Sequence, residues 1–247
     1  MIYAINTQKG GTGKTTTAAS LLQAATLHGL ATIGIDLDPQ GDLTYCLAGD
    51  LHAPGSYELL QGAPSSEVIQ HTRQKVDIIA GTPELQTLAS MRGSARRLQE
   101  SIEPLKSIYD LIIIDTPPTA GELQYNALQA AERLLIPLVT DAYSLNALQQ
   151  VADTAGLVRQ SNPGLKIAGV IVTQYDARAI INRQMLDTVK AAAEARNIPF
   201  LGTVRKAVAA AEAAALRRSI YEYAPKSNPA VDYMEIYSKL ETGRDRI

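Results

Sequence analysis

The stretch Lys9-Gly10-Gly11-Thr12-Gly13-Lys14-Thr15-Thr16 decides the fold. It follows the apolar run at residues 2–5 and precedes a segment with helical periodicity, so it predicts a strand, a glycine-rich turn and the start of a helix. At such a turn, backbone N–H groups, the positive end of the helix dipole and a lysine converge on one anionic group. We therefore predict a phosphate-binding loop, in which Lys14 reaches the β- and γ-phosphates of a nucleotide and Thr15 places its hydroxyl on Mg²⁺.

Two further segments are apolar runs that end in carboxylates. Residues 32–42 end with Asp36 and Asp38 before a Pro-Gln-Gly breaker, and residues 109–118 contain Asp115 followed by Thr-Pro-Pro. Taken singly, an aspartate that closes an apolar strand is often only a turn former. Because ligands gather at the carboxyl ends of parallel strands, we expect these carboxylates beside the phosphate loop. Asp115 is expected to hold Mg²⁺, through water, because Mg²⁺ keeps part of its hydration shell.

Composition indicates a globular protein without a disulfide framework and without a membrane-spanning segment. Of the 247 residues, 46% are hydrophobic and 19% charged, which is ordinary for a globular chain. The single cysteine, Cys46, excludes an internal disulfide framework and a cysteine-rich zinc site. No apolar run approaches the roughly 18 residues of a membrane span, and the sequence opens on a strand with no signal peptide. We expect a cytoplasmic protein.

Apolar runs alternate with helical stretches along the whole chain, which is typical of an α/β fold with a mostly parallel twisted sheet and helices on both faces. We predict one domain over residues 1–247, with an irregular excursion at 48–72 that carries a short helix or two. The predicted strands are 2–6, 31–36, 76–80, 110–115, 133–139, 166–173 and 199–204. The predicted helices are 14–28, 83–91, 95–107, 121–131, 144–160, 179–196, 206–217 and 227–241.

The phosphate loop departs from the standard G-x-x-x-x-G-K-[ST] pattern, because Gln8 replaces its first glycine and Lys9 stands at the entrance. This arrangement resembles the deviant Walker A loop of the ParA/MinD family of P-loop ATPases. The segments 111–131, 170–178 and 223–228 resemble its chromosomal partition branch, so the likeness covers nearly the whole chain. The resemblance is to the short form of ParA, without an N-terminal helix-turn-helix domain, since nothing precedes the first strand.

The resemblance implies a P-loop NTPase fold, ATP hydrolysis, and ATP and Mg²⁺ as cofactors. It also implies an ATP-sandwich homodimer in which Lys9 crosses the interface to the partner's nucleotide, as an arginine finger does. Asp38 would orient the attacking water, and Asp36 would lie near the metal. The expected catalytic residues are thus Lys9, Lys14 and Asp38. The expected nucleotide-binding residues are Lys9, Gly10, Gly11, Thr12, Gly13, Lys14, Thr15 and Thr16. The expected metal site comprises Thr15, Asp36 and Asp115. The family's proline/asparagine pair near the adenine has no clear counterpart around residues 204–207.

Charge is unevenly distributed along the chain. Residues 1–150 carry 9 Lys/Arg against 15 Asp/Glu, and residues 151–247 carry 14 against 10. This asymmetry favours a C-terminal face that contacts nucleic acid. Candidate DNA-binding residues are Arg178, Arg183, Lys206, Arg217, Arg218 and Lys226, although each could equally be a solvated surface charge.

By resemblance, the partners are non-specific DNA, which would place the ATP-bound form on the nucleoid, and a ParB-like centromere-binding protein that stimulates hydrolysis. The resulting hypothesis is a plasmid or chromosome partition ATPase. The alternative is a membrane-surface positioning ATPase of the MinD or cellulose-biosynthesis type, which needs a basic amphipathic helix. The apolar stripe of the last helix is surrounded by charges of both signs, so we interpret it as core packing and expect no membrane contact. A metabolic ligase or reductase on the same loop is a third, weaker interpretation.

Overall fold

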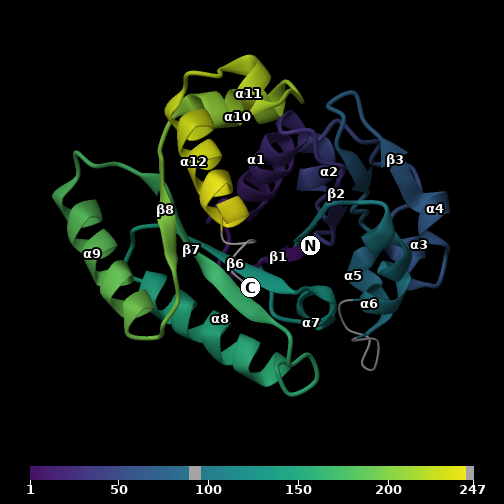
Figure 1. Cartoon of the computed structure of the whole chain (residues 1–247), viewed down its shortest axis with the longest axis horizontal. Coiled ribbons are helices and arrows are strands. Elements are labelled where there is room, and N and C mark those ends of the chain that lie inside the picture. Colours follow the sequence, from purple (N-terminus) through teal and green to yellow (C-terminus); the bar gives the residue numbers. More distant parts are fainter. Residues whose placement is uncertain (89–95, 243–247) are drawn as a thin grey trace.

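The computed structural model describes residues 1–88 and 96–242, and within them eight strands form one twisted sheet (Figure 1). The strand order is β3-β4-β2-β5-β1-β6-β7-β8. All neighbours pair in parallel except β3, which runs antiparallel to β4 at one edge. The strands are β1 Ile2–Ile5, β2 Thr32–Asp36, β3 Ile69–His71, β4 Asp77–Ile79, β5 Leu111–Asp115, β6 Arg133–Leu138, β7 Lys166–Tyr175 and β8 Phe200–Arg205. The predicted α/β architecture is confirmed.

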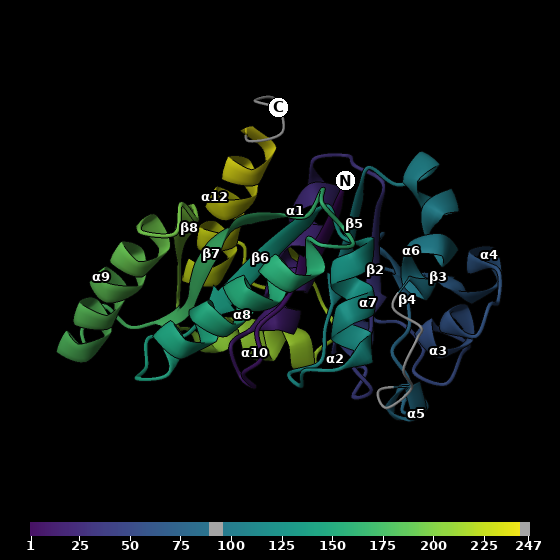
Figure 2. The same cartoon turned by 90° about the horizontal axis from the view of Figure 1, so that it is seen from below.

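Helices cover both faces of the sheet (Figures 1 and 2). Helices α1 and α12, with α10 and α11 beside them, lie on one face, and α7, α8 and α9 lie on the other. The helices are α1 Lys14–Leu27, α2 Asp42–Cys46, α3 Ser56–Leu60, α4 Ser65–Val68, α5 Leu85–Leu88, α6 Arg97–Ser101, the 3₁₀ helix η1 Glu103–Ser107, α7 Glu122–Ala130, α8 Ser144–Val158, α9 Ile180–Glu194, α10 Val208–Ala215, α11 Ile220–Tyr223 and α12 Asn228–Thr242.

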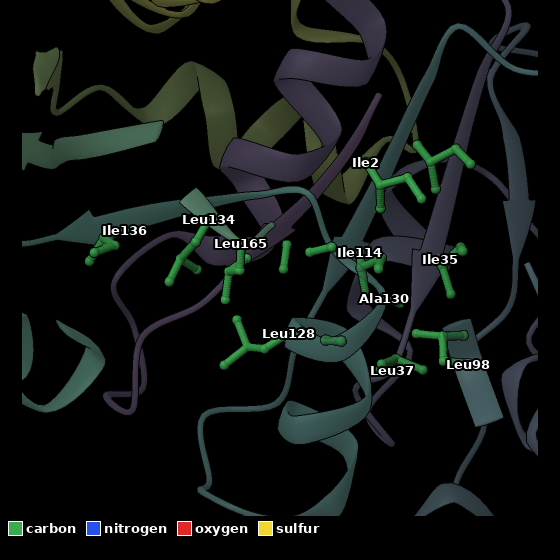
Figure 3. Packing of buried hydrophobic residues seen from close by; sticks show 14 of the residues in the cluster. Ile2, Ile35, Leu37, Leu98, Ile114, Leu128, Ala130, Leu134, Ile136 and Leu165 are labelled. Carbon is green, nitrogen blue, oxygen red and sulfur yellow. The ribbon is translucent and has the colours of Figure 1, made fainter. Parts of the chain in front are cut away.

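The core is split by the sheet into two layers because successive side chains of a strand point to opposite faces. In β1, Ile2 and Ala4 join the cluster under α7 and α8, whereas Tyr3 and Ile5 join the cluster under α1 and α12. Figure 3 shows part of the first layer, where Ile2 and Ile114 of the sheet and Leu128 of α7 are seen. Burial on both faces explains why these strands are nearly continuous apolar runs.

Most predicted elements agree with the structure to within two residues, and the differences have local causes. The sequence does not predict the short strand β3, because its three residues, Ile-Gln-His, are too few to show an alternation of apolar and polar side chains. The predicted helix at 95–107 is two elements, α6 and η1, interrupted at Ile102 just before Pro104, which has no N–H to continue the helical ladder. The predicted helix at 83–91 is only α5 within the described residues, and its last three positions, like residue 95, lie outside them. Helix α11 was missed; Ser219 caps it by accepting from Tyr221 N.

Strand order places the phosphate loop at a crevice. From β1 the chain passes through α1 to β2, beyond β5, while β6 lies on the opposite side of β1. The loops after β1 and β6 therefore diverge at the carboxyl edge, which is where open α/β sheets bind ligands. The register also aligns three strand ends at this edge, because Ile5 pairs with Asp115 and Asp115 pairs with Asp36.

Candidate functional site

A cavity of about 560 Å³ opens at the carboxyl edge of the sheet, above β1 and β5. The phosphate loop forms one wall, the turn after β2 a second, and the loop between β5 and α7 a third. Its lining residues are Gly10, Gly11, Thr12, Gly13, Lys14, Thr15, Asp38, Pro39, Gln40, Asp42, Gln86, Pro117, Pro118, Thr119, Ala120, Gly121 and Leu123. The structure thus brings together six of the eight residues predicted to bind nucleotide.

The loop turns through left-handed backbone at two glycines. Gly11 has φ 72° and Gly13 has φ 80°, values that are disfavoured for a residue with a Cβ. Gly13 is also the residue before the first turn of α1, and its carbonyl accepts from Thr17 N. The loop therefore ends on a helix N-terminus whose first N–H groups have no intrahelical partner, which suits it to an anion.

Lys14 is the cation of the cavity wall. Its side chain is buried, and the cost of desolvating the ammonium lowers its pKa, although the nearby Asp115 and Asp38 act in the opposite direction. Among the described residues, no carboxylate lies within ion-pair distance of Lys14 Nζ. A buried ammonium without a close counter-ion is stabilised by an incoming anion.

Asp36 and Asp115 lie fully buried side by side beneath the cavity, and neither lines it. Thr15 Oγ1 donates to Asp115 Oδ2 at 2.6 Å, while Asp115 Oδ1 has no partner among the described residues. Desolvation raises the pKa of Asp115, and the neighbouring Asp36 raises it further. The pKa of Asp36 is also raised by burial, against hydrogen bonds that favour its ionised form.

Asp36, which was expected in the metal site, has both carboxylate oxygens hydrogen-bonded to the segment that follows β2. Its Oδ2 accepts from Thr44 N at 2.9 Å and from Thr44 Oγ1 at 2.8 Å, and its Oδ1 accepts from Asp38 N at 3.0 Å. Asp36 does not line the cavity. The geometry makes it an anchor that folds the 38–44 turn beneath the site, so Asp115 is the carboxylate with a free oxygen.

Asp38 lies on the cavity wall, as predicted. It is half-buried, and its Oδ1 accepts from Gln40 N at 3.0 Å, which fixes the start of the turn. Its other oxygen carries no hydrogen bond among the described residues. A carboxylate with one oxygen held and one free can accept a proton or hold a water molecule.

Lys9 and Thr16 are placed outside the cavity. The Lys9 ammonium pairs with Asp141, in the turn before α8, and lies over the Tyr143 ring at 5.5 Å from its centroid. Both side chains of the pair are partly exposed, so the pair can be broken at small cost. Thr16 instead lines a small hollow beside Cys46 and α10. A single chain therefore does not direct Lys9 at its own cavity.

The candidate DNA-binding residues fall into separate groups. Arg178 and Lys206 lie near Asp176 at the carboxyl ends of β7 and β8, and hydrogen bonding to Arg178 lowers the Asp176 pKa. Arg183 Nη1 donates to the Ala177 carbonyl at 2.6 Å in the following turn. Arg217 is half-buried, and its guanidinium donates to the carbonyls of Tyr45 and Gly49.

The other two candidates lie further along the chain. Arg218 pairs with Glu222. Lys226 is exposed in the turn before α12.

Sequence reasoning missed several residues that shape the site. The 117–121 loop and Gln86 line the cavity, and Thr173 and Gln174 of β7 bind the phosphate loop from behind. Their distance along the chain from residues 9–16 left no local signal. The Thr-Pro-Pro run after Asp115 was a usable signal for a rigid loop at a strand end.

The chain is similar to known proteins in both sequence and fold. Residues 1–167 match the family model described as an AAA domain. The chain is 38% identical over 198 residues to the chromosome partitioning protein ParA of Myxococcus xanthus, covering 76% of this chain and 70% of that protein. It is 33% identical to the chromosome-partitioning ATPase Soj of Thermus thermophilus, covering 96% of this chain and 94% of Soj.

A solved structure with the same fold contains a nucleotide. Cobyrinic acid a,c-diamide synthase from Mycobacterium smegmatis, with a bound ATP analogue and magnesium, superposes with a TM-score of 0.84 at 29% identity. The match covers 99% of this chain and 96% of that one.

Proposed function

Because this chain belongs to the ParA/Soj family of P-loop ATPases, we propose that it is a DNA-partition ATPase that dimerises around ATP. The observation that carries the proposal is the cavity itself. At the carboxyl edge of the sheet it brings together the phosphate loop, the buried Lys14 without a close counter-ion, and the carboxylates Asp38 and Asp115. This arrangement suits the phosphates of ATP rather than an apolar ligand.

Thr15 and Asp115 are the residues that would hold Mg²⁺. They fit the ion because Asp115 Oδ1 is a buried carboxylate oxygen without a partner, and Mg²⁺ prefers oxygen ligands. The described residues contain no group of three or more histidine, cysteine or acidic side chains suited to a metal, so nucleotide oxygens and water would supply the remaining ligands. The ion, when bound, supplies positive charge to the β- and γ-phosphates.

Asp38 would orient water for in-line attack on the γ-phosphorus. The new bond forms between the water oxygen and phosphorus as the bond to the β–γ bridging oxygen breaks, leaving ADP and inorganic phosphate. Lys14 would stabilise charge on the phosphate oxygens. Catalysis of this kind is mostly positioning and electrostatics, so a carboxylate displaced by about 1 Å costs much of the rate.

Lys9 would leave Asp141 and reach the nucleotide of a second copy of the chain. In the single chain it lies outside the cavity, in a partly exposed ion pair. A lysine that is easily released and placed at the rim suits transfer to a partner, where it would offset charge as an arginine finger does.

DNA binding and stimulation by a ParB-like protein are the finer parts of the proposal. Arg178, Arg183 and Lys206 gather at the same sheet edge as the phosphate loop, so a dimer closed over this edge would present two such groups. Doubling the number of phosphate contacts raises non-specific affinity steeply and makes it salt-dependent.

The membrane-surface alternative receives less support from the last helix. Tyr233, Ile236 and Tyr237 of α12 are buried against α1 and β8, so this stripe is not available to lipid. Among the helices of the described residues, none is long and apolar enough to cross a bilayer.

Size analysis with ATP, ADP and no nucleotide, repeated with duplex DNA, tests the proposal. We expect a dimer only with ATP and Mg²⁺, DNA retention only by that dimer, and weaker retention as salt rises. Lys9→Glu should abolish dimerisation while preserving nucleotide binding by the monomer. A wild-type protein that stays monomeric with a non-hydrolysable triphosphate, or that binds anionic vesicles in place of DNA, contradicts it.

A further inference from the structure

Two side chains of β7 hold the phosphate loop from the side opposite the cavity. Thr173 Oγ1 donates to the carbonyl oxygen of Thr12 at 2.7 Å, with the Leu138 carbonyl oxygen as a second acceptor at 3.2 Å, and Gln174 Nε2 donates to the carbonyl oxygen of Gly11 at 2.7 Å. Thr173 is buried, and its side-chain atoms lie 3.5 Å from where a Cβ on Gly13 would stand. The carbonyls of two consecutive loop residues are therefore held by neighbouring positions of one strand.

These contacts orient the amides that face the cavity. In a trans peptide unit the C=O of one residue and the N–H of the next lie in one plane and point in opposite directions. Holding the Gly11 carbonyl outward therefore turns the Thr12 N–H toward the cavity, and holding the Thr12 carbonyl does the same for Gly13. Neither N–H donates to another group in the described part of the chain. Free, convergent N–H groups are what a backbone nest presents to an anion.

The backbone of β7 departs from regular strand geometry at the same place. Gln174 has φ 53°, a left-handed value uncommon for a residue other than glycine or asparagine. The pairing of β7 with β8 shifts register between Val172 and Tyr175, on either side of it. Strained backbone persists where the surrounding structure requires it, and it is frequent at functional sites.

We propose that Thr173 and Gln174 are positioning residues for nucleotide phosphate binding: they preset the direction of the Thr12 and Gly13 N–H groups. The inference rests on the proposed binding of ATP at this loop. Because the brace acts on the loop before any bond changes, losing it should weaken nucleotide binding and raise KM more than it lowers kcat.

Paired variants separate an effect of the Thr173 and Gln174 hydrogen bonds on nucleotide binding from an effect on the stability of the fold. Thr173→Val removes the hydroxyl with nearly the same shape, and Thr173→Ser restores it. Gln174→Gly removes the amide while accepting the left-handed backbone without strain. The control is Thr72→Val, since Thr72 Oγ1 donates to the Val76 carbonyl at 2.7 Å, far from the cavity.

The measurements are the Kd of a non-hydrolysable ATP analogue with Mg²⁺, the kcat and KM, and the thermal midpoint. We expect Thr173→Val to weaken binding about tenfold and Gln174→Gly about fivefold, since a buried carbonyl left unpaired costs more than an exposed one. Thr173→Ser and Thr72→Val should bind within about twofold of wild type. Unchanged Kd in both β7 variants, or an equal loss in Thr72→Val, overturns the inference.

A second readout keeps the inference distinct from the function it rests on. The backbone amide NMR resonances of Thr12 and Gly13, measured without nucleotide, should shift in Thr173→Val and return in Thr173→Ser. If wild type fails to bind ATP, the proposed function fails, and these two resonances still decide whether the brace orients the loop. Unshifted resonances reject it.

Discussion

The buried pair Asp36 and Asp115 predicts an unusual dependence of stability on pH. Burial raises the pKa of Asp36 to about 7 and that of Asp115 to about 8, whereas both groups titrate near 4 in the unfolded chain. Between these values the folded protein binds more protons than the unfolded one, so the free energy of unfolding falls as pH rises. The stability associated with the protonated pair is fully present below pH 4 and is lost as pH rises through the folded values.

The magnitude follows from proton counting. Each proton held only by the folded state contributes a slope of about −1.4 kcal/mol per pH unit. With folded values near 7 and 8 the pair holds up to two such protons, so the free energy of unfolding falls by about 4 kcal/mol between pH 5.5 and pH 7.5. Urea unfolding of the nucleotide-free protein at several pH values measures this slope directly.

Asp115→Asn tests the assignment, because an amide at this position does not titrate. The variant should be more stable than wild type at pH 7.5, with a clearly flatter slope. Asp153→Asn, an exposed position on α8, serves as the matched control and should leave the slope unchanged. A wild-type stability that stays level or rises over this range, or an Asp115→Asn slope equal to that of wild type, refutes the reasoning.

Four further substitutions test other residues. Lys14→Ala should weaken ATP binding at least 100-fold in titration calorimetry, because the cavity loses its buried cation; binding within tenfold of wild type contradicts this role. Asp38→Ala should trap an ATP-bound dimer in size analysis, and rapid turnover removes Asp38 from the mechanism. Arg217→Ala should lower the free energy of unfolding by about 1–2 kcal/mol, because it loses its bonds to the Tyr45 and Gly49 carbonyls, with DNA retention unchanged. Lys206→Ala should reduce DNA retention at unchanged stability, because its side chain is exposed. A loss of stability with unchanged DNA retention contradicts this role.

The phosphate loop and the two strands that end in an aspartate could be located from sequence because their signals are local. Glycine spacing, the following lysine and a run of branched apolar residues before an aspartate each reflect a constraint within about ten positions. The same signals did not distinguish Asp36 from Asp115. The difference arises because Thr44 N and Oγ1 donate to Oδ2 of Asp36 and Asp38 N donates to its Oδ1, whereas Oδ1 of Asp115 has no partner among the described residues.

The sequence by itself determined an alternating α/β chain with a phosphate loop after its first strand, because hydrophobic period and glycine placement act over short stretches. Only the tertiary structure decided that Lys9 pairs with Asp141, that Arg217 bonds the Gly49 carbonyl, and that Thr173 and Gln174 of β7 bond the phosphate loop. These contacts join residues more than 100 positions apart. Strand order creates them, and no local pattern of residues encodes which strands become neighbours.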